Sequence, residues 1–161
     1  FFSSRRRHTR LQGGLEFRRV LFRSVLERGL PYVLIMEDDC IPEPDFDATV
    51  AEARALMLKG KMDITYLFAS RVAVPETREE RVSPSRRFRR IRRCIGMVAY
   101  LISQRAIKTI LEDVERSKCE IDAAMYTINK AHPELLMFEA LPHCVQHDFD
   151  VRSDVTLKTT K

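Results

Sequence analysis

The sequence predicts an α/β fold, a single domain in which a sheet is flanked by helices. Short apolar runs rich in β-branched residues alternate along the chain with longer segments of helical periodicity. Hydrophobic residues make up 45% of the 161 positions, which is enough for one buried core and too many for a disordered chain. No uninterrupted apolar run of about 18 residues occurs, so no membrane-spanning helix is predicted.

Residues 1–24 differ from the rest of the chain. They have no helical or strand period, and they resemble translated sequencing adapter in two pieces, SSRRRHTRLQG and LEFRRVLFRS. We therefore expect a non-native, disordered segment in place of the natural N-terminal part; a basic arm that binds nucleic acid or anionic lipid is the alternative. The segment has seven arginines and one glutamate, so it accounts for the whole net charge of +5. The remainder is close to neutral, and its charge predicts no nucleic-acid partner.

Strands and helices are predicted in turn from Val25 onward. Residues 32–36 form a short, continuous apolar run that is typical of a buried strand. Asp45 or Asp47 can cap a helix that extends to Leu58 and is ended by Gly60. The apolar side of this helix is expected to consist of Ala48, Ala51, Ala55 and Leu56.

The middle of the chain combines a strand with an expected long loop. Residues 63–68 predict a second strand. Residues 72–93 have little periodicity, two prolines and eight arginines, and we expect them to form a loop.

The last third predicts two helices and two strands. The apolar run 95–102 leads to Ser103, which can cap a helix. The expected buried face of that helix is Ala106, Ile107, Ile110, Leu111 and Val114. Asp122 is expected to begin a further helix over 123–131, and residues 135–138 predict a last strand before a polar, frayed tail from His147.

Three adjacent carboxylates, Glu37, Asp38 and Asp39, follow the first predicted strand. Open α/β sheets bind ligands beyond the carboxyl ends of their strands. Mn²⁺ or Mg²⁺ would relieve the repulsion among these carboxylates, and it would keep positions for phosphate oxygens. Asp39 is the expected metal contact, and Asp38 or Glu37 would serve the ribose, a metal-bound water or a backbone group. The alternative is an acidic turn exposed to solvent.

Four segments, in order, are similar to the motifs of glycosyltransferase family 25, which includes lipopolysaccharide glycosyltransferases and collagen galactosyltransferases. The first is LPYVLIMEDD, residues 30–39, followed by Pro-Asp-Phe at 44–46. The others are residues 96–103, Ile121-Asp122, and Val145-Gln146 with residues 153–155. Four ordered motifs are far more specific than an acidic triplet alone.

The resemblance implies a GT-A-like (Rossmann-like) mixed sheet with flanking helices. It implies an enzyme, a hexosyltransferase that uses a nucleotide-sugar, a UDP-sugar above all, and Mn²⁺ or Mg²⁺. The acceptor would be a saccharide in lipopolysaccharide or envelope polysaccharide biosynthesis, in the cytoplasm at the inner face of the inner membrane. The transfer would be inverting, in which a base removes the acceptor proton.

The resemblance also gives roles to single residues. Asp122 is the candidate base or acceptor-binding residue, and a helix cap is its other possible role. His147 is a candidate metal ligand because a late histidine often completes the metal shell in this fold type; an exposed or hydrogen-bonded histidine is the alternative. The family's N-terminal strand–helix unit, which binds the nucleotide base, is missing. Residues 25–161 are therefore expected to form a partial catalytic domain, and the sequence leaves open whether this truncated chain is active.

The arginines between Arg78 and Arg93 allow other functions. Arg93 is a candidate for the donor diphosphate, and the run as a whole could bind an anionic acceptor such as phosphorylated lipopolysaccharide core or form a solvated loop. Two alternative functions stay open: a non-catalytic basic binding module that uses this run, and a metal-dependent phosphoryl-handling enzyme that uses the acidic triplet. The four cysteines form no CxxC pair, which argues against a zinc ribbon. Cys144 has no orienting third group for nucleophilic catalysis.

Overall fold

The structure is a computed structural model, and it describes residues 2–4, 12–37, 39–75, 77, 82–95, 98–119 and 121–147. The side chains of residues 2–4, 12–17, 122 and 147 are outside that description. The helices are α1 (Gln12–Glu27), α2 (Phe46–Leu58), α3 (Gln104–Ser117) and α4 (Ile121–Ala131). The longer strands are β2 (Tyr32–Glu37), β8 (Ala99–Ser103) and β9 (Met137–Ala140). The three-residue strands are β1 (Phe2–Ser4), β3 (Cys40–Pro42), β4 (Ile64–Tyr66), β5 (Arg71–Ala73), β6 (Phe88–Arg90), β7 (Arg93–Ile95) and β10 (Val145–His147).

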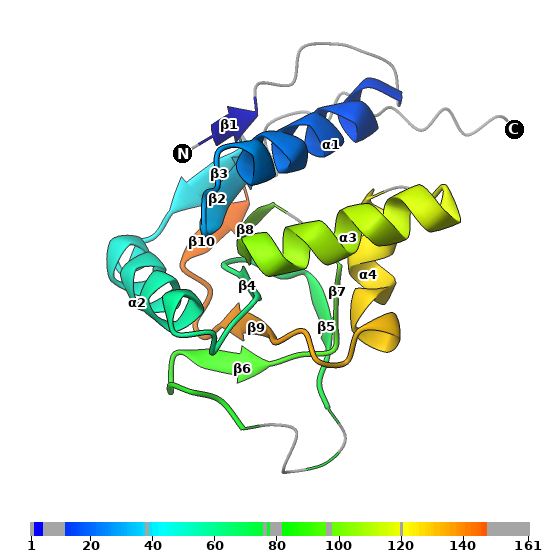
Figure 1. Cartoon of the computed structure of the whole chain (residues 1–161). Coiled ribbons are helices and arrows are strands. Elements are labelled where there is room, and N and C mark those ends of the chain that lie inside the picture. The colour runs from blue at the N-terminus through cyan, green and yellow to red at the C-terminus, as the bar shows by residue number, and fades with distance from the viewer. Residues whose placement is uncertain are drawn as a thin grey trace, which may run out of the picture.

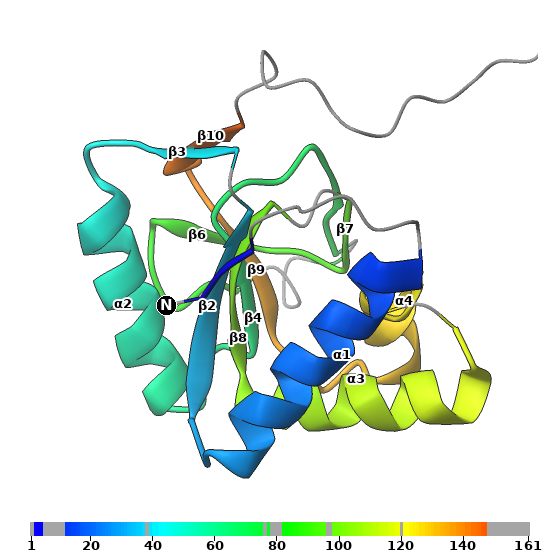
Figure 2. The ribbon, with the colours of Figure 1, turned by 90° about the horizontal axis from the view of Figure 1, so that it is seen from above.

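A six-stranded sheet in the order β1-β2-β8-β4-β9-β6 forms the centre of the molecule. Figure 2 shows α2 on one face of this sheet, and α1, α3 and α4 together on the other. The sheet is mixed, because β4 pairs with β9 in parallel while β8 is antiparallel to both β2 and β4. The predicted α/β fold, with a mixed sheet and flanking helices, is therefore confirmed. Of the helices in the described ranges, none has the length and apolar character needed to cross a bilayer.

Two hydrophobic cores lie on the two faces of the sheet, because successive side chains of a strand point to opposite faces. On β2, Val33 and Ile35 belong to the core beneath α1, α3 and α4. Leu34 and Met36 belong to the core beneath α2. Tyr100 on β8 is fully buried in the first core.

The start and the buried face of α3 agree with the sequence prediction. Ser103 has extended backbone angles, and its hydroxyl accepts a hydrogen bond from the Ala106 N–H at 3.2 Å. This bond satisfies one of the N–H groups that the first turn of a helix leaves without a helical partner. The five residues expected on the apolar face are all buried: Ala106, Ile107, Ile110, Leu111 and Val114. The strong amphipathic pattern thus fixes how α3 packs.

The expectation that residues 1–24 are disordered is wrong for residues 12–24, which form most of α1. Leu21, Phe22 and Val25 are buried in the same core as α3 and α4, with Phe22 and Val25 fully inaccessible. Arginines around the apolar positions obscure this stripe in the sequence; in the fold, the Arg23 side chain is 57% exposed and the Arg18 guanidinium pairs with Glu37. The backbone of β1 also pairs in parallel with β2, with Phe2 opposite Ile35. The adapter origin of the segment stays a prediction.

The expectation of one long loop over residues 72–93 is also wrong, because β5, β6 and the start of β7 lie in or beside it. β6 pairs antiparallel with β9, and β5 pairs with β7. Phe88 is 3% exposed, whereas Arg89 is exposed and Arg90 is half-buried. These short strands contain arginines, so none of them forms an apolar run that would predict a strand. Their pairing partners lie elsewhere along the chain.

Three smaller expectations need correction. In α2 the fully buried positions are Thr49, Ala53 and Met57, rather than the alanines at 48, 51 and 55. The helix does end before Gly60, whose φ of +66° suits glycine. The last strand of the sheet is 137–140 rather than 135–138. Helix α4 begins at Ile121, so Asp122 lies within its first turn instead of preceding it.

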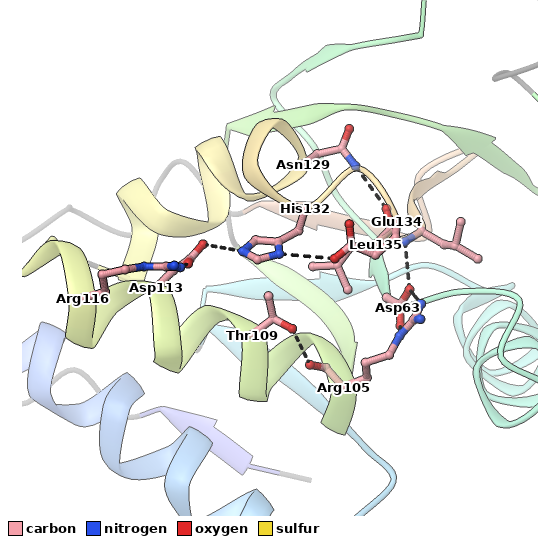
Figure 3. Close-up of polar contacts among 10 residues, drawn as sticks. Asp63, Arg105, Thr109, Asp113, Arg116, Asn129, His132, Glu134 and Leu135 are labelled. Atoms are coloured by element: carbon pink, nitrogen blue, oxygen red, sulfur yellow. Dashed lines mark hydrogen bonds and ion pairs between the residues drawn. The ribbon is translucent and has the colours of Figure 1, made fainter.

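Asp63 joins three elements at the end of the sheet where β4 begins (Figure 3). Its side chain is 4% exposed and accepts hydrogen bonds from the Ser103 hydroxyl at 3.0 Å, from Arg105 Nε at 2.9 Å and from the Leu136 N–H at 2.8 Å. Its backbone N–H donates to the Leu136 carbonyl, and its carbonyl accepts from the Ser103 N–H. One buried carboxylate therefore connects β4, the start of α3 and the segment that leads into β9.

Candidate functional site

The carboxyl ends of β2, β4 and β9 lie at one edge of the sheet, because these three strands run in the same direction. Open α/β sheets bind their ligands at this edge. Glu37 is the last residue of β2, and Asp39 follows the strand there; we call the three acids at positions 37–39 the acidic turn. The Glu37 N–H donates to the Val98 carbonyl at 2.8 Å, which ties the turn to the approach to β8. The predicted place of the acidic residues at a strand end is confirmed, and their ligand roles stay predictions.

Two of the three acidic residues are described, and both are largely removed from water. Asp39 is 9% exposed. The Glu37 side chain is 17% exposed, and its Oε1 lies 3.0 Å from the Arg18 guanidinium on α1. Asp38 is outside the described residues. A turn simply exposed to solvent, the alternative for this triplet, does not fit the burial of Asp39.

The acidic turn is followed by a small two-stranded ribbon, in which β3 pairs antiparallel with β10 (Figure 1). The register places the backbone of His147 opposite Cys40, the residue directly after Asp39. The β3–β10 ribbon therefore brings together two predicted metal ligands that are 108 positions apart in the sequence. The side chain of His147 is outside the described residues, so its ligand role stays a prediction.

The chemistry of the acidic turn suits a hard divalent cation. Glu37 and Asp39 offer carboxylate oxygens, the ligands that Mn²⁺ and Mg²⁺ prefer, and an imidazole is acceptable to Mn²⁺. Among the described side chains, no group of three or more histidines, cysteines and acids is arranged around a common point. Two of the four predicted contributors, Asp38 and the His147 ring, are outside that set.

A second acidic group at the same edge was not predicted from the sequence. Glu139, at the carboxyl end of β9, has a side chain that is only 2% exposed. Arg89 Nε donates to its Oε1 at 2.6 Å, and His143 Nε2 lies 3.4 Å from its Oε2. The His143 ring in turn packs against Phe68, with 5.4 Å between the ring centroids. In the sequence, the one sign of this group is that Glu139 is a single acid inside the apolar run 135–140.

The surroundings of Glu139 change its pKa. Burial raises the pKa, but the hydrogen bonds and charges of His143 and Arg89 outweigh burial, so the pKa of Glu139 lies below its ordinary value. Since the folded chain holds the ionised form more strongly than the unfolded chain does, ionisation of Glu139 stabilises the fold above the ordinary glutamate pKa of about 4.3. That contribution is lost as the pH falls through the lower pKa of the folded state.

We therefore expect Glu139→Gln to lower the free energy of unfolding by about 1.5–3 kcal/mol at pH 7, the range for a hydrogen bond to a charged group. The deficit should shrink at pH 3.5, because this pH lies below the ordinary glutamate pKa of about 4.3 and the unfolded parent is then largely protonated at this position. Denaturant titrations at the two pH values measure it, with Glu134→Gln, whose side chain is 61% exposed, as the control. An equal deficit at both pH values would contradict a role for the Glu139 charge.

The remaining two predicted site residues lie with α4 instead of at the acidic turn. The guanidinium of Arg93 lies over the ring of Tyr126, 5.7 Å from its centroid. Tyr126 is one helical turn after Asp122 on α4, and the side chain of Asp122 is outside the description. The described contacts of Arg93 thus associate it with α4, and none of them joins it to Glu37 or Asp39.

Cys144 is a structural thiol. It is fully buried, and burial, followed by the charge of Asp45, raises its pKa to about 11. At neutral pH a thiol with that pKa holds almost no thiolate, the nucleophilic form. This agrees with the prediction that Cys144 is not the nucleophile of a cysteine–histidine pair.

Comparison with known proteins identifies a family for this chain. The sequence profile of glycosyltransferase family 25, described as an LPS biosynthesis protein, matches residues 19–125, about two thirds of the chain. The matched range includes the acidic turn, β8 and the start of α4, and it ends before β9 and β10. No curated protein matches the chain.

Proposed function

Because the chain belongs to glycosyltransferase family 25, we propose that it transfers a hexose from a nucleotide-sugar, a UDP-sugar, to a saccharide acceptor in lipopolysaccharide biosynthesis. The observation that carries the proposal is the acidic turn at the carboxyl end of β2, where Asp39 is 9% exposed. A carboxylate so far removed from water, next to two other acids in the sequence, is unfavourable unless positive charge is close by. A divalent cation that bridges to the donor diphosphate would supply such charge.

We assign the roles of the single residues as part of this proposal. Asp39 and His147 would hold Mn²⁺ or Mg²⁺, since the β3–β10 ribbon places the backbone of His147 opposite Cys40, the residue directly after Asp39. Asp38 or Glu37 would contact the ribose or orient a water molecule. The bound cation would supply the charge that stabilises a departing diphosphate. Asp122 would accept the proton of the acceptor hydroxyl as the new bond forms at the opposite face of the anomeric carbon, which is inversion.

Asp39→Asn tests the proposal, because it removes one negative charge and changes the shape of the side chain little. We expect kcat/KM for transfer from UDP-hexose to fall by a factor of about 100 or more, equivalent to about 2.7 kcal/mol of transition-state stabilisation. Calorimetric binding of UDP in the presence of Mn²⁺ should be lost in parallel, and EDTA should have the same effect on the parent. UDP binding gives a readout that does not depend on the choice of acceptor.

Asp47→Asn is the matched control, since Asp47 is an exposed acid in the first turn of α2. Its transfer rate and UDP binding should equal those of the parent. Hydrolysis of the UDP-sugar without transfer to any saccharide would favour the metal-dependent phosphoryl-handling alternative. UDP binding that survives both Asp39→Asn and EDTA would refute the role of the acidic turn.

A further inference from the structure

Phe68 and His143 form a pair of rings at the edge of the sheet where the carboxyl ends of β2, β4 and β9 lie. Phe68 comes two residues after the end of β4. The centroids of the two rings are 5.4 Å apart, and the ring planes are tilted by 51°. Both residues are half-buried, and the side chain of His143 is 33% exposed. An aromatic surface therefore meets solvent at the edge where open α/β sheets bind ligands.

The backbone next to His143 is fixed between β4 and the β3–β10 ribbon. The N–H of Cys144 donates to the Leu67 carbonyl at 3.2 Å, and the Cys144 carbonyl accepts from the Glu43 N–H at 2.9 Å. Figure 2 shows this segment leading from β9 to β10, which pairs with β3. The position of His143 therefore lies between the end of β9 and the strand that follows the acidic turn.

Glu139 fixes the orientation of the imidazole. Its side chain is 2% exposed, and its Oε1 is already bonded to Arg89 Nε at 2.6 Å. Its Oε2 accepts from His143 Nε2 at 3.4 Å. A neutral ring that donates from Nε2 has a lone pair on Nδ1, so the second nitrogen is an acceptor. Within the described ranges, the structure shows no donor bonded to that Nδ1.

A pyranose ring matches this combination of groups. A hexose has a face of C–H groups that packs on the face of an aromatic ring, and a rim of hydroxyls that donate hydrogen bonds. Phe68 would supply the apolar surface and His143 Nδ1 the acceptor. A ring side chain has only two torsions to fix, so such a surface loses little conformational entropy when a ligand binds.

The distance from the acidic turn suits the acceptor better than the diphosphate. Only β8 lies between β2 and β4 in the sheet. Because neighbouring strands are about 4.8 Å apart, the ends of β2 and β4 are separated by about 10 Å. A diphosphate at the acidic turn would leave this space to the hexose that it carries, and the acceptor would lie on the far side of that hexose.

We propose that Phe68 and His143 bind a hexopyranose ring of the saccharide acceptor, with Glu139 as the positioning residue for the imidazole. The proposal rests on the proposed glycosyltransferase function for the identity of this ring as the acceptor. It adds a binding role to two residues at the carboxyl ends of the strands and leaves the proton transfer with Asp122.

Saturation-transfer NMR with methyl β-D-glucopyranoside and methyl β-D-galactopyranoside tests the proposal, in EDTA and without nucleotide. At least one glycoside should bind, and sorbitol, a polyol without a ring face, should not. Phe68→Leu keeps the apolar character and removes the aromatic face. We expect it to weaken glycoside binding by a factor of about five or more, the equivalent of one lost aromatic contact.

His143→Gln separates a ligand role from a structural one. The glutamine amide can donate to Glu139 as Nε2 does, but it has no counterpart of Nδ1. The urea midpoint should therefore stay that of the parent, while glycoside binding weakens by a factor of about five, as for one lost hydrogen bond. His132→Gln is the matched control, because the His132 ring also pairs with carboxylates, those of Asp113 and Glu134, and it should bind the glycosides like the parent.

The outcomes distinguish this proposal from the proposed function. Glycoside binding that is lost in Phe68→Leu and His143→Gln but kept in Asp39→Asn supports the subsite even if no transfer is detected. Absence of glycoside binding to the parent, or equal binding by the parent and both variants, would overturn it. If the variants instead weaken Mn²⁺-dependent binding of UDP-glucose but not of UDP or the glycosides, the rings hold the donor hexose and the acceptor proposal is wrong.

Discussion

Replacing Asp63 with alanine is expected to lower the free energy of unfolding by about 3 kcal/mol, since two hydrogen-bonded donors in the interior lose their acceptor and each such loss costs about 1–3 kcal/mol. Those donors are the Ser103 hydroxyl and the Leu136 N–H, at 3.0 and 2.8 Å from the carboxylate. Ser103 also caps α3, so the variant disturbs the position of a helix start as well. The ion pair with Arg105 adds little, because the Arg105 side chain is 56% exposed.

Arg105→Ala is the matched control, since it breaks the same ion pair from its exposed side. We expect it to lower the free energy of unfolding by less than about 1 kcal/mol, the usual limit for a solvent-exposed pair. Urea titrations of the two variants measure the difference. Equal effects would show that the charge pair, and not the interior hydrogen bonds, gives Asp63 its importance.

Phe22→Ala is expected to lower the free energy of unfolding by about 3–5 kcal/mol, the range for truncating a core aromatic residue. Phe22 is fully buried in the core that α1 shares with α3 and α4. Alanine in its place leaves a cavity that the surrounding helices fill only in part. The same urea titration measures the change, together with far-UV circular dichroism of the remaining helix.

Val20→Ala is the control for this prediction, because Val20 is 62% exposed on the same helix. Its effect should stay within about 0.5 kcal/mol, as is usual for surface positions. A neutral result for Phe22→Ala would restore the original expectation that residues 1–24 contribute no ordered structure. The adapter-like origin of the segment and its contribution to folding are thus separate questions.

Local signals in the sequence predicted much of the fold. The Ser103 cap and the five-residue apolar stripe after it define α3 without reference to the rest of the chain, and a continuous apolar run defines β2. The position of the acidic turn follows from the same run, because it begins where the strand ends. In each case the periodicity and the capping chemistry lie within about a dozen residues.

The parts that sequence reasoning missed depend on distant partners. β6 is a strand because it pairs with β9, and Arg89 meets Glu139 across 50 positions of sequence. Residues 72–93, considered alone, show little periodicity, with two prolines and eight arginines. In α2, alanines occur on several sides, so the buried side was decided by packing of Ala53 and Met57 against the sheet.

The pairing of β10 with β3 depends on a short connection between β10 and the central sheet. Three residue pairs join β10 to β3, and a two-stranded ribbon of that length is too weak to persist without other support. Residues 141–144 connect β10 to the sheet, and this short tether keeps the strand at a high effective concentration beside its partner. Leu141 is 38% exposed. One proteolytic cut on the amino side of Leu141 would make the pairing of β10 with β3 bimolecular, so that the buried Cys144 and Val145 alone would hold His147 opposite Cys40, while all six strands of the sheet stayed in one piece.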